Sequence, residues 1–168
     1  MNELFLLRHA DALNGDDDHG RTLSPRGVAE AAVVGARLRK LRPVSMRVLC
    51  SSAIRAQETL EGLKDAEVFA PNDAAPPEVE TGLYLASASE MTARLRRLPA
   101  AAERVLLIAH NPGIYELAML LAGEGDREAY ERLREGLPPA ALCQLEIDTD
   151  WPNLGPGVGR LISCQRPV

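Results

Sequence analysis

The sequence predicts an α/β fold, a three-layer domain in which a mostly parallel central sheet carries helices on both faces. Short apolar runs alternate along the chain with amphipathic segments. Short apolar runs are typical of strands that are buried on both faces, and amphipathic segments are typical of the helices that cover them. Alternation of the two implies right-handed crossovers between parallel strands.

The size and composition of the chain fit one globular domain over residues 1–168. A hydrophobic fraction of 46% and a charged fraction of 26% are ordinary for globular proteins and exclude the disordered and fibrous classes. The formal net charge of -5 argues against a nucleic-acid partner, because nucleic-acid binders present a basic surface. An anionic substrate therefore needs a local cluster of positive charge.

The sequence carries no sign of membrane insertion or secretion. No apolar stretch approaches the ~18 residues of a membrane span, and the apolar run 4–7 leads directly into Arg8. The three cysteines, Cys50, Cys143 and Cys164, form no C-x-x-C pair. Buried, unreactive thiols in a reducing compartment account for this pattern. We therefore expect a cytoplasmic protein without a membrane partner.

The first elements follow from apolar runs and from helix-start signals. Residues 4–7 predict a buried strand, which a polar loop over 14–20 follows. Ser24 and Pro25 supply an N-cap and a first-turn proline for a helix over 26–40, where apolar residues recur at three- and four-residue spacing.

The next segment repeats this order with weaker signals. Residues 48–50 predict a second strand, and Ser51 and Ser52 predict the N-cap of a helix that reaches about residue 63. Residues 67–69 predict a short strand, and the proline-rich residues 70–77 predict a loop.

The second half of the chain contains the clearest strand signal. Ser87 and Glu90 form a plausible capping box for a helix that reaches about residue 98, and residues 105–109 are a continuous apolar run. Asn111 and Pro112 resemble an N-cap and a first-turn proline. The remaining expected elements are helices to about 122 and over 126–135, and strands over 142–147 and 158–164.

Polar side chains follow the three best strands, where ligands bind in open α/β sheets. Arg8 and His9 follow the first strand, Arg55 lies in the first turn of the helix after the second, and His110 follows the third. We expect these side chains to converge in one pocket, to which helix N-termini add exposed N–H groups.

This set of residues suits phosphoryl transfer. Arginine gives multidentate contacts to phosphate and keeps its charge. A histidine beside two arginines is disfavoured in its charged form, so that one imidazole nitrogen stays free to attack phosphorus. A second histidine can donate to the phosphoryl oxygens. The residues therefore predict transfer through a phosphohistidine intermediate, without a metal or another cofactor.

Three segments at these strand ends resemble the signature elements of a known family, the phosphoglycerate mutase-like histidine phosphatase superfamily. They are Leu7-Arg8-His9-Ala10, the S-x-x-x-R-A-x-x-T segment from Ser51 to Thr59, and His110-Asn111-Pro112-Gly113. Their order and their positions at expected strand ends make the resemblance specific. Two positions depart from the family pattern: Ser52 stands where proline is common, and Gly20 stands where an acidic residue often precedes the arginine.

The resemblance is strongest to the small SixA-like branch of phosphohistidine phosphatases. Shared features are Ala10-Asp11, the run over 21–27 and the H-N-P-G element. The resemblance implies His9 as the nucleophile and three phosphate ligands, Arg8, Arg55 and His110. Arg21 and Asn111 are expected to add further substrate contacts.

The identity of a general acid stays open. Superfamily members that act on phosphate esters use a carboxyl from the region between the second and third elements to protonate the leaving oxygen, and Glu80 is the candidate here. The segment Leu83-Tyr84-x-Ala86-Ser87 resembles the small branch, in which no such acid is well fixed. A phosphoramidate leaving group can carry its own proton.

The leading hypothesis is a metal-independent phosphatase whose substrate is phosphohistidine on a protein domain. The chain has no long insertion to form a lid, and an open groove suits a bulky substrate. Three alternatives remain: a phosphomonoesterase of the same superfamily, a non-catalytic module that binds a phosphorylated ligand, and a metal-dependent hydrolase. The last would use His9, Asp11 and His19 with the aspartates at 16–18, which otherwise form a solvated loop.

Overall fold

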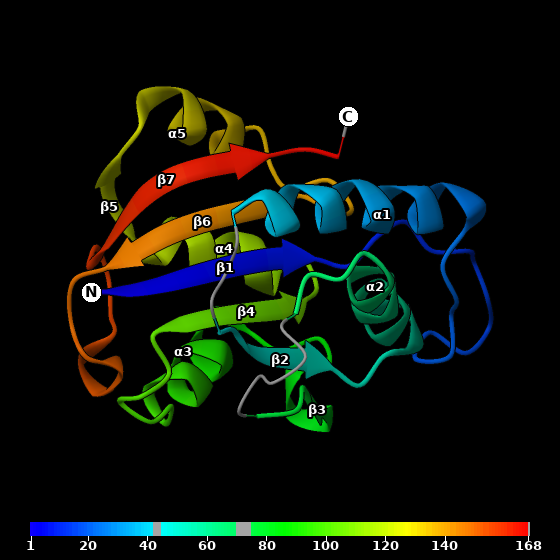
Figure 1. Ribbon diagram of the computed structural model, residues 1–168, viewed down its shortest axis with the longest axis horizontal. Helices are drawn as coiled ribbons and strands as arrows, with labels where there is room; N and C mark the ends of the chain where they lie inside the picture. The colour runs from blue at the N-terminus through cyan, green and yellow to red at the C-terminus, as the bar shows by residue number, and fades with distance from the viewer. Residues whose placement is uncertain (42–44, 70–74, 168) are drawn as a thin grey trace.

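The fold is built around a seven-stranded sheet. The computed structural model describes residues 1–41, 45–69 and 75–167. The strand order is β3-β2-β4-β1-β6-β7-β5 (Figure 1). β1 (Asn2–Arg8) lies at the centre, parallel to β4 (Arg104–Ala109) and antiparallel to β6 (Leu142–Ile147). β2 (Arg47–Ser51) continues the parallel half beside β4. The predicted α/β architecture is confirmed.

Short strands complete both edges of the sheet. β3 (Glu78–Glu80) is parallel to β2, while β7 (Gly159–Gln165) is antiparallel to β6 and carries β5 (Ala122–Gly125) as a parallel neighbour. Most strand pairs are therefore parallel, and the antiparallel ones all involve β6.

Helices cover the two faces of the sheet, which bury separate sets of apolar side chains. α1 (Pro25–Lys40) and α2 (Ile54–Asp65) cover one face (Figure 1), and α3 (Ala88–Arg96), α4 (Gly113–Leu121) and α5 (Arg127–Arg134) cover the other. Because strand side chains alternate between faces, Leu106 packs under α1 and α2 while Leu107 packs under α3 and α4.

The edge strand beside β2 differs from the prediction, which was wrong for residues 67–69. The N–H groups of Ala66, Glu67 and Val68 close the end of α2, and Glu67 has a φ of 57° that no strand accommodates. Because these N–H groups already donate to carbonyls of α2, they are not available for pairing with a neighbouring strand. The edge is built by residues 78–80, whose exposed Val79 between two glutamates gives no apolar run. Residues 70–74 of the expected loop lie outside the described residues.

Two of the four predicted helix starts are confirmed. The Ser24 hydroxyl accepts from the N–H of Gly27 at 3.0 Å, and the Ser87 hydroxyl accepts from that of Glu90 at 3.1 Å. At α2 the N-cap residue is Ala53, and α4 begins after Pro112, in both cases without a side-chain cap. Ser51, Ser52 and Asn111 have other partners, which belong to the candidate site below.

The cysteines are buried, as predicted. Burial raises the pKa of Cys50 to about 12, so that its thiol stays protonated. Cys143 and Cys164 face each other across β6 and β7 with their sulfur atoms 3.2 Å apart. None of the described helices is both long and apolar enough to span a bilayer.

Gly27 fixes the start of α1 against the loop that follows β1. A Cβ at this position would lie 2.0 Å from the backbone oxygen of Asp11, which cannot move aside as a side chain can. We expect Gly27→Ala to lower the free energy of unfolding by about 3 kcal/mol, measured by denaturant titration.

Gly82→Ala is the matched control, because no atom lies within 4 Å of its added Cβ. We expect it to change stability by less than about 0.5 kcal/mol. Equal losses in both variants would contradict a steric role for Gly27.

Candidate active site

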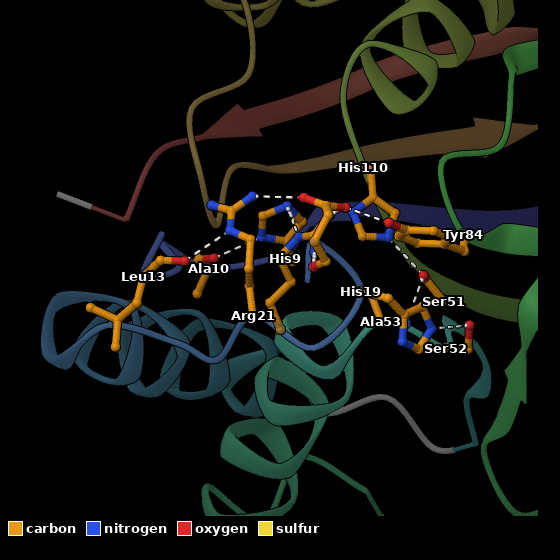
Figure 2. A network of polar contacts seen from close by, with 12 residues as sticks. His9, Ala10, Leu13, His19, Arg21, Ser51, Ser52, Ala53, Tyr84 and His110 are labelled. Atoms are coloured by element: carbon orange, nitrogen blue, oxygen red, sulfur yellow. Dashed lines mark hydrogen bonds and ion pairs between the residues drawn. The ribbon is translucent and has the colours of Figure 1, made fainter. Parts of the chain in front are cut away.

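The carboxyl ends of β1, β2 and β4 meet and place His9, Ser51 and His110 together. The His9 N–H donates to the carbonyl of Ala109 at 3.1 Å, which sets the two strand ends side by side. The rings of His9 and His110 lie 5.0 Å apart between centroids. Figure 2 shows both rings at the centre of a polar network, to which Arg21 and Tyr84 contribute from loops.

The contacts of His9 show which of its two ring nitrogens carries the hydrogen. Nδ1 lies 2.7 Å from the carbonyl oxygen of Ala10, and Arg55 Nε lies 3.3 Å from Nε2. A carbonyl only accepts and a guanidinium only donates, so Nδ1 carries the hydrogen and Nε2 carries a lone pair. Burial, with smaller contributions from Arg55 and Arg8, lowers the pKa of His9 to about 4. The ring is therefore neutral at neutral pH, with an unprotonated lone pair on Nε2.

Arg55 links His9 to the loop before α1. Its side chain is 3% exposed, and besides its contact with His9 it donates to the Asp18 carbonyl at 2.6 Å and to the Asp18 carboxylate at 3.1 Å. One turn later in α2, the Thr59 hydroxyl donates to the Arg55 carbonyl at 2.7 Å and accepts from the Ala10 N–H at 3.0 Å. Thr59 thus holds the first turn of α2 against the backbone that follows His9.

His110 bonds to Ser51 instead of leaving that hydroxyl to cap α2. Its Nε2 lies 2.7 Å from Ser51 Oγ, which also accepts from the N–H of Ala53 at 3.2 Å. When the Ser51 hydroxyl donates its hydrogen to Nε2, the neutral ring carries its own hydrogen on Nδ1, which has no partner in the protein. Burial and the proximity of His9 lower the pKa of His110 to about 3.

The carbonyl of Leu137, in the loop before β6, holds two side chains of the site. It accepts from Arg8 Nη1 and from Asn111 Nδ2, both at 2.8 Å. Asn111 therefore bonds across the chain and does not cap α4, which explains why that predicted helix start was wrong.

Unpartnered polar atoms gather in this region. Among the described residues, four buried side-chain polar atoms have no hydrogen-bond partner: Arg47 Nε at the start of β2, and Arg8 Nε, His110 Nδ1 and Asn111 Oδ1 at the strand ends. Unpaired buried polar atoms are costly and rare in folded proteins. Three of the four lie at the strand ends that carry His9 and His110, where Arg8 Nε is a donor and Asn111 Oδ1 an acceptor that a polar ligand could satisfy.

Asp18, His19 and Tyr84 contact the site, whereas the sequence suggested Asp18 and His19 only as ligands of the metal-dependent alternative and assigned Tyr84 no contact. The Asp18 carboxylate accepts from Arg55, from Arg21 Nη1 at 3.1 Å and from the Tyr84 hydroxyl. His19 bonds through Nε2 to Ser52 Oγ at 2.9 Å, and its ring meets the Tyr84 ring edge-on. The three-residue spacing of Asp18 and Arg21 was the available signal, although a solvated loop explains that spacing equally well.

The carboxylate of Glu80, the candidate general acid, is engaged by Arg94. Both of its carboxylate oxygens accept from Arg94 Nε at 2.9 Å, and Glu78 accepts from Arg94 Nη2 at 2.7 Å. The side chain of Arg94 is 15% exposed and pairs with these two glutamates of β3.

The donor set of the metal-dependent alternative is dispersed. The Asp11 carboxylate accepts from Ser24 Oγ at 2.6 Å, and His19 bonds to Ser52. Within residues 1–41, 45–69 and 75–167, no three His, Cys, Asp or Glu side chains are gathered in a way that could hold a metal ion.

Known proteins resemble this chain over nearly its whole length, although no family model matches it. An uncharacterized protein of Mycobacterium tuberculosis is 30% identical over 96% of this chain and 99% of its own. The SixA protein of Nakamurella multipartitia, designated a phosphohistidine phosphatase, superimposes with a TM-score of 0.83 at 28% identity, covering 99% of this chain and 96% of that one.

A second solved structure, the protein histidine phosphatase SixA in complex with tungstate, gives a TM-score of 0.76 at 25% identity over 98% of this chain and 97% of that one. The fold, the order of the strand-end residues and these similarities agree. The chain belongs to the histidine phosphatase superfamily, in its SixA-like branch, and is a phosphatase.

Proposed function

We propose that the chain removes phosphate from phosphohistidine on a protein, through a phosphoryl group carried on Nε2 of His9 and without a metal ion. The observation that carries this proposal is the neutral His9 ring, whose Nδ1 hydrogen bonds to Ala10 and whose Nε2 faces Arg55. A lone pair held beside guanidinium groups is the arrangement that attack on a phosphoryl group requires.

The reaction proceeds in two balanced steps. Nε2 of His9 attacks phosphorus while the N–P bond of the substrate breaks, and the substrate ring, protonated on its other nitrogen, leaves as neutral imidazole. Water then attacks the phosphorus on His9, the Nε2–P bond breaks, and inorganic phosphate is released. The Ala10 carbonyl keeps the Nδ1 hydrogen in place throughout. Arg8, Arg55 and the Nδ1 hydrogen of His110 stabilise the phosphoryl oxygens, and they supply charge that a metal would otherwise supply.

The surroundings of Glu80 favour a phosphoramidate over a phosphate ester. An alkoxide leaving group needs a proton donor, and both oxygens of Glu80 are occupied by Arg94. An imidazole leaving group that already carries a proton needs no such donor.

Exposed leucines beside the site favour a protein substrate. Leu13 is 48% exposed and its carbonyl accepts from Arg21, while Leu85 is 56% exposed and directly follows Tyr84. Apolar side chains exposed around a polar site are typical of surfaces that contact a protein partner.

Turnover of a phosphohistidine-bearing protein domain is to be compared with that of a sugar phosphate and a nucleotide, each with and without a chelator. We expect kcat/KM to be at least about 100-fold higher for the phosphohistidine protein, since its leaving group needs no general acid. The chelator is expected to leave the rate unchanged.

Two results would contradict the proposal in different ways. Preference for a small ester would indicate the phosphomonoesterase alternative. Loss of activity with the chelator, restored by added metal, would indicate the metal-dependent hydrolase.

A further inference from the structure

The carboxylate of Asp18 is held by the donors that surround the nucleophile. Oδ2 accepts from Arg55 Nη2 at 3.1 Å and from the Tyr84 hydroxyl, and Oδ1 accepts from Arg21 Nη1 at 3.1 Å. Hydrogen bonds from Tyr84, Arg21 and Arg55 hold the pKa of Asp18 well below its usual range. The loop therefore presents a full negative charge to two guanidinium groups.

One of these donors, Arg55, also contacts the atom that carries the transferred group. Arg55 donates through Nε to His9 Nε2, the atom on which the phosphoryl group is carried in the proposed reaction, and through Nη2 to Asp18. A carboxylate and a phosphoryl group present similar pairs of oxygens to a guanidinium. Two anions on one guanidinium edge repel each other, so Asp18 and the phosphoryl group compete for Arg55.

Asp18 and Tyr84 differ in how firmly they are held. Asp18 lies in a loop and its side chain is 48% exposed. The Tyr84 ring, in contrast, meets His110 and His19 edge-on, at 5.6 Å and 4.8 Å between centroids (Figure 2). Displacement of the carboxylate would thus leave the Tyr84 hydroxyl beside the site, with its donor ready for a new acceptor.

We infer that the Asp18 carboxylate occupies the position of a phosphoryl oxygen, that the substrate must displace it, and that Tyr84 then donates to the substrate as a further phosphate ligand. The Asp18 carboxylate thus competes with the substrate for the same hydrogen-bond donors, and it weakens the binding of any oxyanion. This inference rests on the proposed phosphate site, and it adds one ligand and one opposing charge to that site.

Tungstate, the oxyanion bound in the SixA relative, is the probe for a first test by calorimetry. We expect Asp18→Asn to bind tungstate about tenfold more tightly than the wild type, because the competing charge is removed. Asp16→Asn removes the same charge two residues away, on an exposed side chain, and is expected to alter the dissociation constant by less than about twofold. Unchanged or weaker binding in Asp18→Asn would overturn the inference, since Asp18 would then only orient the arginines.

The role of Tyr84 is tested in the Asp18→Asn background, where no carboxylate remains for its hydroxyl to hold. Adding Tyr84→Phe is expected to weaken tungstate binding at least about tenfold, the usual effect of removing a hydrogen bond to a charged group. Equal or tighter binding in the double variant would overturn the assignment, because Tyr84 would then serve only as an anchor for Asp18.

Binding is measured without turnover, which separates this inference from the proposed function. Equal tungstate affinity in wild type, Asp18→Asn and Asp16→Asn would overturn only the inference. Failure of both the wild type and Asp18→Asn to bind tungstate would overturn the phosphate site and the inference together.

Discussion

Replacement of His9 by alanine is expected to lower kcat by at least about 10⁴-fold, the largest effect of any single substitution in this chain. The neighbouring histidine cannot substitute for it, because Nε2 of His110 is engaged with Ser51. Steady-state kinetics on the phosphohistidine protein measures the loss. An alkaline quench with labelled substrate is expected to capture phosphate on the wild type and none on the variant.

Tungstate binding distinguishes loss of the nucleophile from loss of the fold. His9→Ala keeps Arg8, Arg55 and His110, so it is expected to bind tungstate within about fivefold of the wild-type affinity. Substantial turnover in a variant that still binds tungstate would refute the phosphohistidine intermediate.

Removal of Arg55 is expected to have the second largest effect, a fall in kcat/KM of about 10³-fold in Arg55→Ala. This guanidinium contacts both Nε2 of His9 and the anion position held by Asp18. Arg55→Lys keeps the charge but not the planar set of donors, so we expect it to recover about tenfold of that loss.

Arg55 also contributes to the low pKa of His9, although burial contributes more. Loss of a nearby positive charge favours the protonated ring, so the pKa of His9 is expected to rise in Arg55→Ala, measured by NMR titration. Arg127→Ala, which removes a 93% exposed guanidinium on α5, is the matched control. It is expected to change neither kcat/KM nor the pKa of His9. A wild-type rate in Arg55→Ala would contradict the assignment of Arg55 to the phosphate site.

The features that the sequence predicted are those that follow from local hydrophobic pattern and from the general topology of α/β sheets. The run at 105–109 could be recognised as β4 because all of its side chains are apolar, and the rule that ligands bind at strand ends then placed Arg8, His9, Arg55 and His110 together. This expectation needed only parallel strands, which the alternation of strands and helices implies.

Features that depend on contacts between distant segments could not be predicted. Ser51, Ser52 and Asn111 fit the local rule for N-caps, yet each bonds to a partner far along the chain. Tyr84 bonds to Asp18, which lies 66 residues away in the sequence, and hydrophobic periodicity does not predict how two loops contact each other. Local capping preferences amount to about 1 kcal/mol, so such long-range partners override them readily.

The Leu137 carbonyl has a consequence for the way in which the chain folds. Each residue assigned to the phosphate site precedes residue 112, but Arg8 is fixed by a carbonyl 129 residues further along. Closing so long a segment is slow compared with the formation of local helices. During synthesis, His9 and His110 leave the ribosome before the segment that holds Arg8. A chain interrupted before Leu137 contains the residues proposed to bind phosphate but lacks the contact that positions Arg8.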